Sequence, residues 1–419
     1  MTQAPPRRGI RTNLGQFLLQ TVQVFFVGLI IGMERNVLPV MSRHFGVKAH
    51  AFFFLASFVI SFGLVKGALN FVAGGLSDRI GRKRVLLYGW LAGLPIPVLI
   101  DLAPNWWWVI GANVFLGINQ ALTWTMTVTS QIDLAASHER GLAVGINEAL
   151  GYIAVGAAGL ATGYGALADG ARATVLVFGL ATILFALALL IPMEDTIHWV
   201  RAEAAETPDA PRPTATEGAL ATFTRVSFRH ATYRAVCQGG VANKIADTLV
   251  WVLLPLFFKA HGLGIVRIGW ITGLYAMVWG LSQLVTGHLA DRVGRKLPIV
   301  SGFGLLAAAL AAIASLHAFG DWIASAVVMG LGMALLYPNL IAAMSDLAPP
   351  GERGRILGVY RYWRDTGYAV GGLILGFVAQ ITHHVGPAIW LTAALVAGSG
   401  LWIALAVAET HTRPLPRQG

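Results

Sequence analysis

Nine ionisable side chains lie inside long apolar stretches of the chain, where an isolated charge is unfavourable. On insertion scales a charge at the middle of a membrane costs about 2.5–3.5 kcal/mol, so it needs an opposite charge or a water-filled cavity. We therefore predict that all nine face the interior of a helical bundle, where such residues typically mark a path for a solute or an ion. They are Glu34, Arg35, Lys66, Glu148, Lys244, Asp247, Arg361, Arg364 and Asp365.

Four of these charges are spaced so that they can pair within one helix. Lys244 and Asp247 are three residues apart, and Arg361 and Asp365 are four apart, the spacings at which side chains meet on a helix surface. For these four, a structural role and a functional role stay equally open. The other five have no such partner and are the stronger candidates for binding or coupling, with Glu34 as the candidate carrier of a coupling proton.

The composition places these charges in a membrane protein. Of the 419 residues, 56% are hydrophobic and 12% are charged, and the mean hydropathy is +0.66, whereas a soluble domain has about 25% charged residues. A soluble globular protein is therefore excluded. A span needs about 20 apolar residues, and the sequence predicts twelve spans, at 15–40, 51–75, 85–103, 106–130, 141–167, 173–192, 235–258, 266–289, 297–318, 321–344, 355–381 and 386–408.

The distribution of Lys and Arg predicts the orientation of these spans. The side that holds both termini carries 20 of these residues outside the spans and the other side carries five, namely Arg43, Lys48, Arg172, Lys259 and Arg267. By the positive-inside rule both termini are expected in the cytoplasm, with the protein in the plasma membrane. Because topology accounts for the net charge of +10, no nucleic-acid partner is expected.

The longest polar stretch divides the twelve spans six and six. It contains Pro208, Pro211 and Pro213 among Glu, Ala and Thr, a composition typical of a flexible linker. We predict an N-terminal six-helix bundle at 1–193, a cytoplasmic linker at 194–232 and a C-terminal six-helix bundle at 233–419. The first span is expected to be retained, because it lacks a small-residue cleavage site. One cysteine and no metal-ligand spacing predict no metal site and no cofactor.

A repeat relates the two halves at an offset of 213 residues. The pattern G-x-x-x-D-R-x-G-R-K occurs at 74–83 and again at 287–296, and D-L-A-x-x-x-E-R-G occurs at 133–141 and at 346–354. Two independent loops at one offset imply two parallel six-helix halves related by a pseudo-twofold axis, with a site between them. Glu34 and Asp247 are also 213 apart, which predicts equivalent faces of the first and seventh helices for these two carboxylates.

The repeated loop resembles the signature loop of the major facilitator superfamily of secondary transporters, and the resemblance covers essentially the whole chain. It implies an all-helical membrane fold in which helices 1, 4, 7 and 10 line the path, so that Asn119, Trp124 and Tyr337 become candidate path residues. It also implies that the loops latch the halves together. We expect the glycines to make tight reversals and Asp78 and Asp291 to lie near helix N-termini. The loop residues concerned are Gly74, Asp78, Arg79, Gly81, Arg82, Gly287, Asp291, Arg292, Gly294 and Arg295.

The motifs narrow the possible functions. No phosphate-binding G-x-x-x-x-G-K-[ST], H-E-x-x-H or G-x-S-x-G occurs, which disfavours an ATP-driven pump and an intramembrane enzyme. We predict a monomeric secondary active transporter surrounded by lipid, coupled to protons or another ion. Five basic against four acidic residues in the spans favour an anionic or zwitterionic small-molecule substrate. An exporter of hydrophobic or cationic compounds, and a solute sensor or scramblase on the same fold, remain alternatives.

Overall fold

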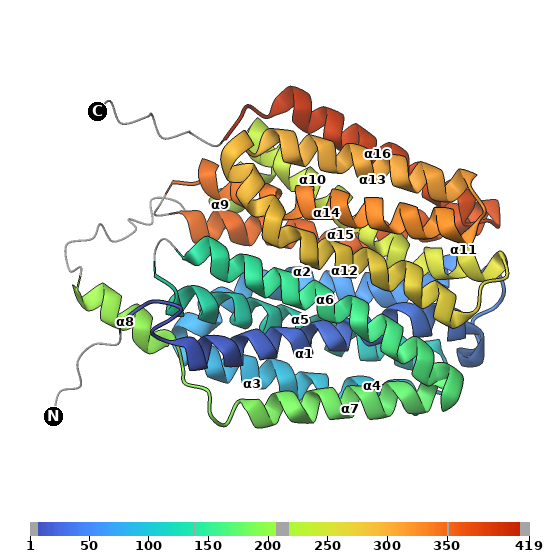
Figure 1. The fold of residues 1–419 in the computed structure, drawn as a ribbon, viewed down its shortest axis with the longest axis horizontal. Helices are drawn as coiled ribbons and strands as arrows, with labels where there is room; N and C mark the ends of the chain where they lie inside the picture. The colour runs from blue at the N-terminus through green and yellow to red at the C-terminus, as the bar shows by residue number, and fades with distance from the viewer. Residues whose placement is uncertain (1–6, 137–138, 207–217, 350–351, 411–419) are drawn as a thin grey trace.

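The computed structural model describes residues 7–136, 139–206, 218–349 and 352–410. In these ranges the regular structure is entirely helical. Figure 1 shows the helices of the first half, blue to green, packed beside those of the second half, yellow to red, and all run roughly along one direction. α1 begins and α16 ends at the same end of the bundle, which we call the terminal end; the other is the far end.

The first half is built from long helices joined by short turns. A short 3₁₀ turn, Ser42–Phe45, follows α1, and α3 gives way to α4 at Leu94, where Pro95 starts a new helix; a proline at the first helical position suits this break because it lacks an N–H group. The helices are α1 (Leu14–Met41), α2 (Phe52–Ile80), α3 (Arg82–Gly93), α4 (Pro95–Asp101), α5 (Trp106–Leu134), α6 (Arg140–Ala168), α7 (Ala171–Leu189) and α8 (Ile197–Glu206).

The second half repeats this plan with one marked irregularity. α10 is followed by a π-helical turn, Leu249–Leu253, before the chain continues as α11 with Pro255 in its first turn; π turns of this kind often occur at functional sites. The elements are α9 (Ala219–Thr224), a π turn (Arg225–Arg229), α10 (Ala231–Thr248), α11 (Leu254–Ala260), α12 (Ile265–Val293), α13 (Lys296–Ser315), α14 (Phe319–Leu347), α15 (Arg353–Thr382) and α16 (Gly386–Ala406).

Each of the twelve predicted spans coincides with a helix or with consecutive helical segments. Ten of the described helical segments are long and apolar enough to cross a membrane. The other two, α5 and α15, are 29 and 30 residues long but more polar, because α5 carries Asn113, Asn119 and Gln120 and α15 carries three charged residues near its middle. The stretch predicted as a linker is partly helical, since it contains α8 and α9; its residues 207–217 lie outside the described ranges.

Two long helix pairs join the halves, and glycines make them close. α2 packs along α15, and α6 packs along α12. A Cβ placed on Gly156 would lie 2.5 Å from the carbonyl oxygen of Gly273, and one on Gly280 would lie 2.6 Å from that of Ala149. Small residues at such positions let helix backbones approach each other in a membrane.

The repeated loops form matching structures at the terminal end. Arg82 donates to Asp78 (2.6 Å) and to Asp133 (3.2 Å), and Arg295 donates to Asp346 in the same way (3.3 Å). The two Arg–Asp contacts that span separate helices therefore recur at the offset of 213. The side chain of Asp291 lies outside the described residues.

The structure corrects two expectations about these loops. Asp78 does not lie at a helix N-terminus, because α2 continues to Ile80 and leaves it in the last turn. The carboxylates at the N-termini of α3 and α13 are instead Asp195, which accepts from the backbone N–H of Arg82 (3.0 Å), and Glu409, which accepts from that of Arg295 (2.8 Å). Such carboxylates pair with the exposed N–H groups of a helix start.

The glycines of the loops also divide into two kinds. Gly81 and Gly294 make the reversals, with φ of 97° and 96°, and a Cβ on either would collide with the carboxylate of Asp195 or Glu409. Gly74 and Gly287 lie inside α2 and α12, where no described atom other than the nearby backbone of the same helix lies within 4 Å of the position of a Cβ. The expected role in a tight reversal is therefore wrong for Gly74 and Gly287.

This difference predicts opposite effects for two glycine substitutions. Gly81→Ala should destabilise the fold by about 1–3 kcal/mol, because its backbone conformation is nearly restricted to glycine. Gly74→Ala is the matched control and should be neutral or stabilising by up to about 1 kcal/mol, since alanine is the better helix former. Melting temperatures of the purified variants in detergent measure both. Equal melting temperatures would contradict the assigned role of Gly81.

Candidate functional site

A buried ion pair joins the two halves at the middle of the bundle. Both terminal nitrogens of Arg35 in α1 donate to the carboxylate of Asp247 in α10, at 2.7 and 3.1 Å. Asp247 also accepts from the hydroxyl of Tyr368 (2.6 Å) and from the Lys244 ammonium (3.4 Å). The bidentate geometry and the extra donors satisfy the oxygens of this carboxylate, which is what a buried charge requires. The predicted pairing of Lys244 with Asp247 is thus present.

Aromatic rings enclose the ammonium of Lys244. It lies 4.8 Å from the ring centre of Trp279 and 5.1 Å from those of Tyr337 and Tyr368, distances at which a cation is attracted to the face of a ring. It also donates to the hydroxyl of Tyr152 (3.2 Å). Tyr152 in α6 stacks on Trp279 in α12 with centroids 3.6 Å apart, so this enclosure is built from both halves.

A chain of hydrogen bonds connects the carboxylates of Glu148 and Asp365 to the same centre. Glu148 accepts from the indole of Trp124 (2.9 Å) and from the hydroxyl of Tyr337 (3.1 Å). Arg364 in turn donates to the hydroxyl oxygen of Tyr337 (3.0 Å). It also donates two hydrogen bonds, of 2.7 and 2.9 Å, to the carboxylate of its neighbour Asp365.

Asp365 also ties α15 to the first half. Besides Arg364 it accepts from the side-chain amide of Asn70 in α2. The predicted i,i+4 pairing of Arg361 with Asp365 is wrong, because Arg364 and Asn70 occupy the carboxylate. The side chain of Arg361 is half-buried on the same helix and makes no hydrogen bond or ion pair with a described residue.

Lys66 is a buried cation that lacks a polar partner among the described residues. Only 7% of the residue is exposed, and its ammonium forms neither a hydrogen bond nor an ion pair with the residues that the structure describes. Instead it lies near the rings of Phe62 (5.4 Å), Trp124 (5.5 Å) and Tyr368 (6.0 Å). An ammonium in these surroundings can bind an anionic group without first breaking a salt bridge.

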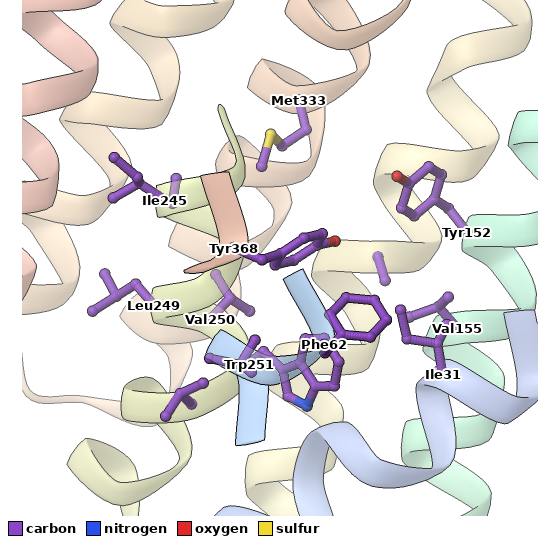
Figure 2. Packing of buried hydrophobic residues seen from close by; sticks show 14 of the residues in the cluster. Ile31, Phe62, Tyr152, Val155, Ile245, Leu249, Val250, Trp251, Met333 and Tyr368 are labelled. Carbon is purple, nitrogen blue, oxygen red and sulfur yellow. The ribbon is translucent and has the colours of Figure 1, made fainter. Parts of the chain in front are cut away.

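Three rings lie directly beyond the charges toward the far end. Figure 2 shows Phe62, Trp251 and Tyr368 close together, and their centroids are 5.1 to 5.9 Å apart. Arg35 lies over the ring of Trp251 at 5.1 Å. The void beside Arg35 measures about 10 Å³. Room for a solute at this place therefore has to come from movement of the halves.

We call the eight charged residues Arg35, Lys66, Glu148, Lys244, Asp247, Arg361, Arg364 and Asp365 the central cluster. Trp124 and Tyr337, predicted as path residues, bridge its members. Asn119 does not reach it, because its amide donates to the carbonyl of Gly89 in α3 (2.9 Å) and so joins two helices of the first half.

Glu34 is separate from the central cluster. It is fully buried, and neither of its carboxylate oxygens has a hydrogen-bond partner among the described residues. Its polar neighbour is Asn113 in α5, whose own side-chain oxygen also lacks a donor. Glu34 and Asp247 thus do not occupy equivalent environments. The first and seventh helices are out of register, since Pro39 and Pro255 are 216 apart rather than 213, and three residues rotate a side chain about 60° short of a full turn.

The residues missed from the sequence carried two detectable signals. Asn70, Tyr152, Trp251 and Tyr368 each follow a predicted charged residue by four positions, one helical turn later on the same face. Trp279 and Tyr152 lie 213 residues from Lys66 and Asp365, at the equivalent positions of the other half. These residues were not predicted because they carry no charge, and because aromatic residues in a span more often pack against other helices than bind a ligand.

The pair of Arg35 and Asp247 predicts a strong coupling in stability. Arg35→Gln or Asp247→Asn alone should cost about 3–5 kcal/mol, because each leaves a buried charge unpaired. The double variant should be distinctly less destabilised than the sum of the two. Thermal unfolding of the four proteins in one detergent closes the cycle. Strict additivity would show that the two residues do not stabilise each other.

Comparison with known proteins identifies the family of this chain. A family model described as the Major Facilitator Superfamily matches residues 21–243 and 236–419. An uncharacterised MFS-type transporter of Mycobacterium tuberculosis, Rv1250, is 28% identical over 153 residues, which are 36% of this chain and 24% of that protein. The quinolone resistance protein NorA of Staphylococcus aureus is 28% identical over 141 residues, which are 33% of this chain and 35% of NorA.

The matches to these relatives thus span about a quarter to a third of their length. The family model, by contrast, covers nearly the whole chain in two copies, as the internal repeat requires. The predicted fold class is confirmed: the chain is an integral membrane protein that belongs to the Major Facilitator Superfamily.

Proposed function

We propose that this chain is a secondary active transporter that moves a small organic anion or zwitterion by alternating access, driven by protons. The observation that carries the proposal is the unpartnered ammonium of Lys66 at the boundary of the two halves. The central cluster contains five basic and three acidic residues, so a substrate with one or two negative charges would balance it. Burial of an unbalanced charge is unfavourable, and this favours an anionic group beside Lys66 and Arg361.

Alternating access follows from where the cross-half contacts lie. The pair of Arg35 and Asp247 and the stack of Tyr152 on Trp279 both join the halves at mid-membrane. When the halves rock apart at either end, these contacts have to shift or exchange partners. A substrate anion near Lys66 would compete with Asp247 and Asp365 for the same cations, and this links binding to the rearrangement.

The orientation is part of the proposal. With 20 basic residues outside the spans on the terminal side and five on the other, the terminal end would face the cytoplasm of a plasma membrane and the far end would face outward. The division into bundles at 1–193 and 233–419, joined by 194–232, and a monomeric state are proposed with it.

A second candidate, an exporter of hydrophobic or cationic compounds, has one observation in its favour. Trp124, Tyr152, Trp279 and Tyr337 surround the cluster with ring faces, and such faces also bind organic cations. The relative NorA is named for quinolone resistance. In this reading Glu148 or Asp247 would be the counter-ion.

Replacement of Lys66 distinguishes these candidates. Lys66→Gln should weaken binding of an organic anion such as benzoate by about 10- to 150-fold, the loss of one hydrogen bond to a charged group. Its melting temperature without ligand should be unchanged or higher, because no ion pair is broken. Lys66→Arg, which keeps the charge, is the matched control. Titration of purified protein by thermal shift reports both quantities, with tetraphenylphosphonium as the cationic probe. Stabilisation of the wild type by the cation and not by the anion would establish the exporter candidate instead.

Glu34 is the proposed carrier of the coupling proton. A neutral carboxylic acid fits its surroundings, since it can donate to the unpaired oxygen of Asn113 while a charge there would have no partner. Glu34→Gln should abolish accumulation driven by an imposed pH gradient in proteoliposomes and leave substrate exchange intact. Asn113→Ala tests the local contact. Gradient-driven accumulation by Glu34→Gln at the wild-type rate would exclude this residue as the carrier.

A further inference from the structure

A cavity of about 330 Å³ lies at the far end, between the two halves. Its first wall is the segment between α1 and α2, with Arg43, Lys48 and His50, and its second wall is α11, with Leu256 and Lys259. A volume of this size is at the lower end of the range for small-molecule sites. The central cluster contributes none of its walls, so the cavity is a separate feature of the molecule.

The charge in this cavity is entirely basic. The described residues that line it include Arg43, Lys48 and Lys259 and no Asp or Glu. Arg43 lies close enough to Lys259 for their positive charges to repel each other. The side-chain nitrogens of Arg43 and Lys48 have no acceptor among the residues that the structure describes. No acidic side chain among the described lining residues offsets this repulsion.

The gathering of these cations is unexpected on this side of the protein. The far side holds only five Lys and Arg residues outside the spans, and three of them line this one cavity. The other two have structural contacts: Arg172 donates to the carbonyls of Asp101 (2.7 Å) and Ala103 (2.8 Å), and Arg267 lies over the ring of Phe319 at 5.5 Å. The positive-inside rule disfavours basic residues on this side, so membrane topology does not explain why Arg43, Lys48 and Lys259 lie together.

The cations come from both halves and meet where the halves touch. The Lys259 ammonium donates to the carbonyl of Val40 across the boundary (2.9 Å). His50 of the first half contacts His383 of the second with ring centroids 6.0 Å apart. An anion held between Arg43 and Lys259 would therefore bind both halves at once.

We propose that this cavity is a second binding site, which takes a small oxyanion (a carboxylate or a phosphate) from the water at the far end and holds the two halves together there. Phe52, Leu55 and Leu256 also line the cavity, so an oxyanion that carries a short apolar group could place that group against them. Because the site is complete only when the halves meet, an anion binds this state more tightly than one in which the far end is open. It thus shifts the population toward closure at this end.

The first test uses the purified full chain in a neutral detergent with inorganic phosphate, against chloride at equal ionic strength. Phosphate should raise the melting temperature of the wild type. In Arg43→Gln and Lys48→Gln the phosphate concentration for half of the effect should rise about 10-fold or more. Arg267→Gln, which removes a charge on the same face outside the cavity, is the matched control and should behave as wild type. Equal responses in Arg43→Gln and Arg267→Gln would overturn the proposal, since only general screening would then remain.

The second test measures closure. Ala56 in α2 is 1% exposed and packs against Gly376 of α15 near the far end, so a cysteine in Ala56→Cys would be shielded when this end is closed. Phosphate should slow its reaction with a polar maleimide several-fold, and Arg43→Gln should remove the effect. Unchanged labelling in phosphate would overturn the bridging role.

Two further arms separate the possible sources of the effect. Lys66→Gln should keep the response to phosphate, because the site does not depend on the central cluster or on its proposed substrate. Protection by phosphatidylglycerol with none by soluble phosphate would assign the cavity to a lipid headgroup and contradict a site open to the aqueous phase.

Discussion

The burial of charge between two helical halves is the constraint on which the rest of this structure depends. Eight charged side chains meet at mid-membrane, and the bidentate pair of Arg35 and Asp247 joins residues 212 positions apart in the sequence. In a medium of low polarity each charged carboxylate must be surrounded by donors. The carboxylate of Asp247 therefore accepts hydrogen bonds from Arg35, Lys244 and Tyr368. These bonds fix α1, α10 and α15 relative to one another.

The same constraint limits how the halves can move. In the proposed alternating-access mechanism, one end can open only if the paired charges at the centre keep partners throughout, either by exchange within the cluster or through a bound solute. The glycine contacts between α6 and α12 suit this requirement, because Gly156 and Gly273 present backbone to backbone and offer little side-chain bulk that would resist a change of angle. The charged centre and the glycine contacts between the helices thus both fit the proposed movement of the halves.

The sequence predicted the fold more fully than the site, and the reasons are physical. Helix lengths follow from local composition, and the repeat is visible when the sequence is compared with itself, so the spans and the paired loops could be located. The contacts of Arg82 with Asp133 and of Arg295 with Asp346 were not predicted. Partner choice depends on the rotation of one helix against another. Asp365 pairs with Arg364 and Asn70 rather than Arg361, and Asn119 turns toward α3, because tertiary packing and not spacing decides between neighbours. Glycine roles were likewise decided by where α2 ends, which composition does not determine.

The two halves of the repeat agree at the loops of the terminal end and differ at the central cluster. At the terminal end the residues at an offset of 213 are chemically the same and make the same contacts, as Arg82 with Asp133 and Arg295 with Asp346 show. At the centre the equivalent positions are occupied but differ in chemistry. At the offset of 213, the position of Lys66 corresponds to that of Trp279, Trp124 to Tyr337, Glu148 to Arg361 and Tyr152 to Asp365.

Two halves that began as copies would need identical contacts wherever the fold alone is at stake. A solute is not twofold symmetric, so the surface that binds it must break the symmetry. Apart from Arg361, the residues of these four pairs lie within one contact network around Lys244 and Tyr337. The loss of symmetry in this network, within a scaffold that keeps it, supports the proposal that the substrate binds at the central cluster.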